Sequence, residues 1–165
     1  MNRIKKLGMS FVYAGRGIAY CLRHERNIRI HIVALLYVLF FSQFYNFSKS
    51  EYMILILTCS TVIALELINT AIEIVIDKVS PKFSVFAMMG KDVAAGGVLV
   101  GAIGAVIVGV ILFWDIEVFK EIFCFFTMDW YKPFLLVLSI ILAVLFIGKT
   151  KHRGGNATKM LNEKD

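Results

Sequence analysis

Charged residues are scarce in this chain, and proline and cysteine are scarcer still. Asp, Glu, Lys and Arg together make up 18% of the 165 residues, and there are two prolines and three cysteines. An average soluble domain is about 25% charged, so this composition argues against an ordinary soluble surface. Cys21, Cys59 and Cys124 are odd in number and widely spaced, which predicts neither a disulfide framework nor a metal site.

Apolar sequence takes the place of the missing charge. Hydrophobic residues make up 59% of the chain, and its mean hydropathy is +0.76. This composition, with the charges confined to short blocks, indicates one small all-α integral membrane domain. The sequence predicts spans over residues 28–44, 52–76 and 93–114, and a shorter fourth apolar helix over residues 133–148. The net charge of +6 does not indicate nucleic-acid binding, because the basic residues flank the apolar runs as topology signals and anionic-lipid contacts.

Residues 1–24 predict a helix that lies on the membrane surface. An apolar stripe at helical spacing is formed by Leu7, Phe11, Ala14, Ile18 and Leu22. Tyr13 and Arg16 lie on another face, so the segment is either a plain lipid anchor with snorkelling arginines or a surface that contacts a ligand. The basic residues at its start lead into this amphipathic segment, so we expect no cleavable signal peptide.

The distribution of Lys and Arg predicts a cytoplasmic N-terminus. With four spans and the N-terminus inside, all but Lys49, Lys120 and Lys132 of the 18 basic residues fall on the inner side, as the positive-inside rule requires. This orientation brings one group of polar residues to the same cytoplasmic surface: Glu25, Glu73, Asp77, Lys91 and Asp92.

The second predicted span carries acidic side chains inside an apolar run. The polar residues there are Glu66, Asn69, Glu73 and Asp77. Steps of three, seven and eleven residues turn a helix by about 300°, 700° and 1100°, so all four share one narrow face. They could form a polar seam between helices. Three acids on one face repel one another unless a cation or a proton intervenes, so the pattern favours a metal and acid–base site at the cytoplasmic mouth of a helix bundle.

Two shorter polar segments flank the predicted spans. In the segment before the first span, Glu25 alone is consistent with an ion-paired surface residue, and His31 alone with a structural histidine. Lys91 and Asp92 open the third span, and we expect them at a helix start near the bilayer surface, where phosphates bind well. Small residues recur every four positions in that span, a seam that lets membrane helices approach closely: Gly97, Gly101, Ala105 and Gly109.

Three motifs carry a resemblance to a known family. They are Glu66-x-x-Asn69-x-Ala71-x-Glu73-x-x-x-Asp77, Lys91-Asp92-Val93-Ala94-Ala95-Gly96, and Glu25-x-Asn27-x-Arg29-x-His31 with the preceding Gly17. Together they resemble the prokaryotic diacylglycerol kinase family over about residues 8–114. The pair Ala94-Ala95 is similar to the Gram-positive branch, whose members mainly phosphorylate undecaprenol, whereas the Gram-negative diacylglycerol kinases carry Gly-Ser there.

The resemblance implies a multi-pass lipid kinase of the bacterial plasma membrane. Its expected form is a homotrimer of three-span subunits, with active sites shared between neighbouring chains at the cytoplasmic surface. Its expected reaction is Mg²⁺-assisted in-line transfer of phosphate from ATP to undecaprenol, giving undecaprenyl phosphate, with diacylglycerol as the alternative substrate. The implied catalytic base is Glu66, and the implied metal ligands are Glu25 and Glu73. The implied ATP-binding residues are Tyr13, Gly17, Glu25, Glu73, Asp77, Lys91 and Asp92, and the implied lipid-binding residues are Glu66, Asn69 and Asn27.

One departure from the family pattern leaves an alternative function open. Lys82-Phe83-Ser84 stands where the family usually has Glu-Tyr-His, so a non-catalytic relative that lost nucleotide binding is a second hypothesis. A proton or ion conductor is disfavoured, because no acidic residues continue the row toward the outer leaflet. We expect a kinase domain over residues 1–114, an extracytoplasmic connector and extra apolar helix over residues 115–148, and a disordered basic tail over residues 149–165.

Overall fold

The computed structural model describes residues 3–82 and 84–149, which are almost entirely helical. The elements are α1 (Arg3–His24), α2 (Arg26–Phe41), the short 3₁₀ helix η1 (Ser42–Phe44), α3 (Lys49–Val79), α4 (Val85–Phe113), α5 (Ile116–Met128) and α6 (Tyr131–Gly148). Within these residues, four segments are long and apolar enough to cross a membrane: α2 with η1, α3, α4 and α6. This confirms the all-α membrane fold and the fourth apolar helix.

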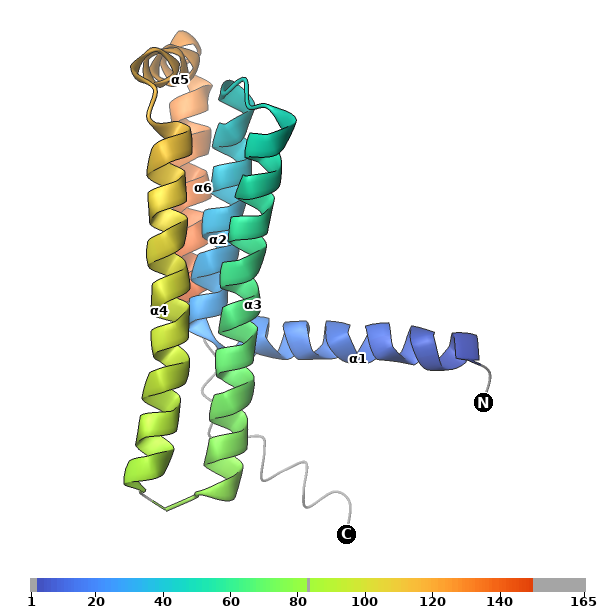
Figure 1. Ribbon diagram of the computed structural model, residues 1–165. Helices are drawn as coiled ribbons and strands as arrows, with labels where there is room; N and C mark the ends of the chain where they lie inside the picture. The colour runs from blue at the N-terminus through green and yellow to red at the C-terminus, as the bar shows by residue number, and fades with distance from the viewer. Residues whose placement is uncertain (1–2, 83, 150–165) are drawn as a thin grey trace.

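The four spanning helices stand side by side, and α1 leaves the bundle to one side (Figure 1). Helix α3 packs against α4 and also contacts α2 and α1, while α6 packs against α2. Exposed Leu7 and Phe11 lie on α1, where an apolar surface suits a helix lying in a membrane interface. Helices α3 and α4 extend past the level at which α1 leaves the bundle (Figure 1).

Local sequence signals set both ends of α3. At its start, the Ser48 side chain accepts a hydrogen bond from the Glu51 amide (3.3 Å), and the Glu51 carboxylate accepts one from the Ser48 amide (2.7 Å). This reciprocal capping satisfies amides that lack a partner within the helix. At its end, Pro81 has no amide hydrogen and cannot continue the helix.

Helix α4 begins earlier than the sequence predicts, at Val85 instead of residue 93. Lys91 and Asp92 therefore lie in its second turn, and the prediction that they open a helix is wrong. The helix can start there because residues 85–92 contain no proline, and Gly90 is tolerated inside the helix. It allows a close contact with α3, since a Cβ on Gly90 would lie 3.0 Å from Ile76 Cδ1.

Residues 115–148 form two helices, of which α5 lies in the predicted connector and α6 is the predicted apolar helix. The Asp115 side chain caps α5 by accepting hydrogen bonds from the amides of Glu117 (2.9 Å) and Val118 (3.4 Å). Phe125 of α5 packs against Phe44, with ring centroids 5.1 Å apart. The predicted basic tail, residues 149–165, lies outside the described residues apart from Lys149.

Candidate active site

The acidic face of α3 becomes more exposed along its length. Glu66 is 2% exposed and Asn69 is buried, Glu73 is half-buried, and Asp77 is exposed. The change follows the geometry of the fold, because the last turns of α3 extend past α1 (Figure 1). One helix face thus offers a buried carboxylate at one level and solvated carboxylates nearer its end.

Glu66 lies against polar side chains from α2 and the bend before it. The Asn27 side chain donates a hydrogen bond to the Glu66 carboxyl, and His31, Glu73 and Glu25 are close enough to interact with it electrostatically. Glu66 Oε2 is buried and has no hydrogen-bond partner among the described residues. A buried acceptor without a partner costs about 1–3 kcal/mol, so this oxygen marks a place where a donor can bind.

Asn69 lies between Glu66 and Glu73 along this face of α3. Its Nδ2 donates a hydrogen bond to Glu73 Oε1 (3.1 Å) one turn further along α3. Asn69 Oδ1 is buried and has no partner in the described part of the chain. The amide therefore holds the Glu73 carboxylate in place and keeps an acceptor available beside Glu66.

Lys91 of α4 forms an ion pair with Asp77 of α3. Both side chains are partly exposed, and such pairs contribute only about 0–1 kcal/mol to stability. The pair places a lysine ammonium at the solvated end of the acidic face. Asp92 follows Lys91, is exposed, and forms no hydrogen bond or ion pair with the residues that the structure describes.

Two of the expected nucleotide-binding residues lie apart from this cluster within one chain. Tyr13 on α1 is 59% exposed, and its ring centroid lies 5.9 Å from the Arg16 guanidinium carbon. Gly17 has open space around it. Both residues belong to α1, which leaves the bundle to one side (Figure 1).

The donor set fits a magnesium ion that is shared with phosphate groups. The described residues contain no group of three His, Cys, Asp or Glu side chains that could hold a metal by themselves. Glu25 and Glu73 both lie near Glu66, and their carboxylates are the hard oxygen ligands that Mg²⁺ takes alongside nucleotide phosphates.

The structure adds two polar residues, His31 and Thr70, to the surroundings of the site. His31, interpreted from sequence as structural, interacts electrostatically with Glu66. A signal was present, since Asn27 and His31 are four residues apart and share a face of α2. Thr70 is 2% exposed beside Asn69, and no sequence signal distinguished it from other threonines in apolar helices.

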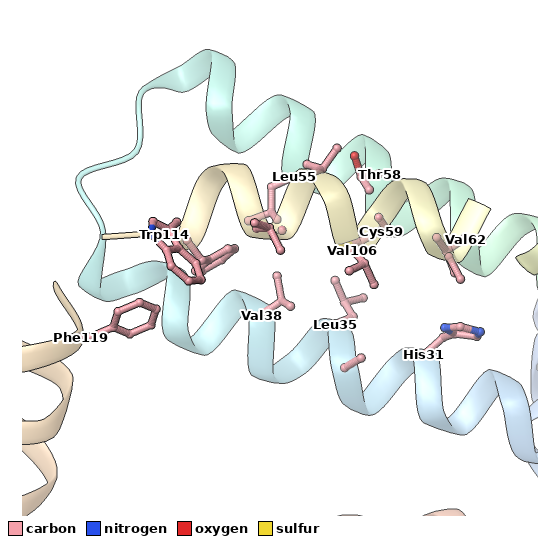
Figure 2. Close-up of a pocket in the computed structure, with 17 residues that line it drawn as sticks. His31, Leu35, Val38, Leu55, Thr58, Cys59, Val62, Val106, Trp114 and Phe119 are labelled. Carbon is pink, nitrogen blue, oxygen red and sulfur yellow. The ribbon is translucent and has the colours of Figure 1, made fainter. Parts of the chain in front are cut away.

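An apolar cavity of about 580 Å³ lies between α2, α3 and α4. It runs from His31 at one end to Trp114 and Phe119 at the other (Figure 2). Val62 also lines it, one helical turn before Glu66. The cavity therefore ends near the buried polar cluster, because His31 at its end interacts electrostatically with Glu66.

Comparison with known proteins gives a consistent result. Residues 12–113 match the family described as prokaryotic diacylglycerol kinase. An undecaprenol kinase of Bacillus subtilis is 39% identical over 112 residues, which are 68% of this chain and 91% of that protein. A diacylglycerol kinase of Synechocystis is 40% identical over 102 residues, 61% of this chain and 58% of that protein. A diacylglycerol kinase of Escherichia coli K12 is 28% identical over 103 residues, 62% of this chain and 84% of that protein.

No solved structure matches the chain. The family match covers the acidic face of α3, the Glu25 bend and the Lys91 turn, and it ends where α4 ends. On this evidence the chain belongs to the prokaryotic diacylglycerol kinase family, a family of membrane lipid kinases.

Proposed function

We propose that this protein transfers the γ-phosphoryl group of ATP to a membrane lipid alcohol, with undecaprenol as its preferred substrate. The observation that carries the proposal is the buried Glu66 carboxyl. Its Oε2 has no partner among the residues that the structure describes, and it lies one turn from an apolar cavity. The preference for undecaprenol is supported by Ala94-Ala95 and by the similarity to the undecaprenol kinase of Bacillus subtilis.

In the proposed reaction Glu66 is the general base. The hydrocarbon chain of the substrate lies along the apolar cavity, and its hydroxyl group donates a hydrogen bond to Glu66 Oε2. As the hydroxyl oxygen forms its bond to the γ-phosphorus, the bond from that phosphorus to the bridging oxygen of ADP breaks, and the hydroxyl proton passes to Glu66. Asn27 holds the carboxyl in orientation through its hydrogen bond.

The solvated end of the acidic face is the proposed nucleotide site. Glu25 and Glu73 would hold a magnesium ion bound with ATP, which would neutralise phosphate charge in the transition state. Asn69 keeps the Glu73 carboxylate oriented. The ion pair with Asp77 at this end supports a role for Lys91 in contacting phosphate oxygens, and Asp92 beside it would complete the polar surface.

We also propose that each site is completed by a neighbouring copy in a homotrimer in the bacterial plasma membrane, with the sites on the cytoplasmic side. Tyr13 is exposed and Gly17 has open space around it, and both lie on α1, which leaves the bundle. This supports a role for α1 at the active site of a neighbouring chain. The positions of Lys and Arg support the orientation.

Glu66→Gln tests the assignment of the base. We expect turnover to fall by about 10²–10⁴-fold, the usual contribution of a positioned acid or base, with Mg-ATP binding retained. The measurements are phosphate transfer from labelled ATP to undecaprenol or diacylglycerol, and isothermal titration with Mg-ATP. Glu121→Gln, at an exposed position on α5, is the matched control and should keep full activity.

The same measurements separate the alternatives. Undiminished turnover in Glu66→Gln would refute the assigned base, and faster transfer to diacylglycerol would replace undecaprenol as the substrate. If wild-type protein neither binds Mg-ATP nor transfers phosphate, the chain is a non-catalytic relative whose altered connector has lost the nucleotide.

A further inference from the structure

Arg29 is a buried arginine whose hydrogen bonds join three helices. Its side chain belongs to α2 and is 4% exposed. Nε donates to Leu22 O (2.5 Å) and Nη2 to Arg23 O (2.7 Å), both in the last turn of α1. Nη1 donates to Phe146 O (2.9 Å) and Lys149 O (2.5 Å) at the end of α6.

These hydrogen bonds satisfy backbone carbonyls at the C-terminal ends of α1 and α6. The last four carbonyls of a helix lack partners within it, and the C-terminus carries partial negative charge, so a cation there is favourable. One planar guanidinium can satisfy carbonyls of two helix ends together, because its donors point outward in a fixed fork. The Phe146 ring adds a cation–π contact, with its centroid 5.4 Å from the Arg29 guanidinium carbon.

The position of this junction connects it to the active site. Glu25 is the residue between α1 and α2, with an extended backbone (φ −105°, ψ 130°), and its amide donates to Cys21 O (2.8 Å). Arg29 lies one turn later and bonds to the two carbonyls that follow Cys21 O. The path of the chain at Glu25 is thus held by Arg29, and Arg29 is held in turn by the end of α6.

We propose that Arg29 is a positioning residue for Glu25, and that α6, which lies beyond the family match, braces the active site through it. A second contact holds α6 in place, since Tyr37 of α2 and Ser139 of α6 share a hydrogen bond (2.9 Å). The proposal rests on the proposed function, in which Glu25 binds the metal that accompanies ATP. It gives α6 an effect on catalysis that acts through its hydrogen bonds with Arg29.

The test uses the full chain in membranes or micelles, with Arg29→Gln and Phe146→Ala as variants. Amide hydrogen exchange should increase at the last turns of both α1 and α6 in Arg29→Gln. The Mg²⁺ concentration for half-maximal phosphate transfer should rise about tenfold, the usual effect of losing a group that orients a metal ligand, while KM for the lipid stays unchanged. Arg29→Lys should lie between wild type and Arg29→Gln, because an ammonium lacks the fork.

Phe146→Ala keeps the test decisive if Arg29→Gln does not fold. It changes only α6, yet it should increase exchange at the end of α1 and raise the Mg²⁺ requirement. Phe134→Ala, also an exposed phenylalanine on α6 but at its other end, is the matched control and should change neither.

Exchange that increases at one helix end alone, or an unchanged Mg²⁺ requirement in active protein, would overturn the proposal. An inactive wild-type protein would instead refute the proposed function, and the exchange result would still decide whether Arg29 couples α1 to α6.

Discussion

At the scale of single residues, Glu66 shows how burial and polarity combine at this site. It is 2% exposed in an apolar helix, and its immediate support comes from Asn27 on α2. A carboxylate in hydrocarbon is costly unless neighbouring groups compensate. The amide of Asn27 supplies part of that compensation and also fixes the direction in which the carboxyl points.

Asn27→Ala should therefore lower kcat without abolishing Mg-ATP binding. We expect a decrease of about ten- to a hundredfold, because hydrogen bonds to charged groups contribute about 1.5–3 kcal/mol. Steady-state kinetics with the lipid alcohol in mixed micelles measures it. Asn46→Ala, in the exposed loop before α3, is the control and should behave as wild type; equal losses in both variants would argue against a specific role for Asn27.

At the scale of elements, the packing of α4 against α3 determines where the site residues lie. Gly101 allows a close contact between them, since a Cβ there would lie 2.6 Å from Leu65 Cδ1. Leu65 directly precedes Glu66, so the small side of α4 supports the helix turn that carries the proposed base. Gly97, Gly104 and Gly109 have no such neighbour in the single chain.

Gly101→Val should destabilise this helix pair. Overpacking usually costs about 1–3 kcal/mol, and we expect a decrease of that size in the free energy of unfolding together with reduced turnover. Denaturant unfolding in micelles, followed by circular dichroism, measures the first quantity. Gly104→Val introduces the same side chain where nothing lies within 4 Å, so a loss as large as that of Gly101→Val would show that the Leu65 contact is not the cause.

At the scale of the whole molecule, the two ends of the bundle differ in character. One end holds the bend between α1 and α2, the last turns of α3 and the end of α6, and the other holds α5 (Figure 1). Glu25 lies in that bend, and Lys91 pairs with Asp77 in the last turns of α3. The positive-inside rule predicts that the first end faces the cytoplasm. The native cysteines provide a direct measurement of this orientation.

Cys124 should react with a membrane-impermeant maleimide added to intact cells, and Cys21 should not. Cys124 is exposed and shares the polar face of α5 with Glu117 and Lys120, whereas Cys21 is buried beside the Glu25 bend. Cys124→Ser should remove the labelling. Labelling that requires cell lysis would place α5 on the cytoplasmic side and reverse the topology.

Mixing two inactive variants tests whether sites are shared between copies. Gly17→Asp places a carboxylate on the surface of α1, where it should repel a nucleotide bound to a neighbouring chain, and Glu66→Gln removes the base. If α1 of one copy serves the site of another, co-assembled variants should recover part of the wild-type activity that neither has alone. Activity that never exceeds that of the separate variants would show that each chain builds its own site.

The sequence predicts the acidic face of the site, because all of its residues lie on one helix, α3. Glu66, Asn69, Glu73 and Asp77 share a face because a helix has a fixed period, and no knowledge of other elements is needed to see it. The sequence predicts the start of α4 eight residues too late, because the charged pair Lys91-Asp92 separates the apolar residues 93–114 from the first turns of the helix, which begins at Val85. The charged and aromatic residues after α4 predict a connector, and only the structure shows that Ile116–Met128 are helical within it.

Sequence alone determined that this is a helical membrane protein with acids along one face of its second span, since composition and helical period are local properties of the chain. Tertiary structure alone decided which residues support those acids. Asn27 and His31 meet Glu66, and Arg29 meets the end of α6 more than a hundred residues away. Such contacts depend on how helices pack against one another, and no local pattern encodes them.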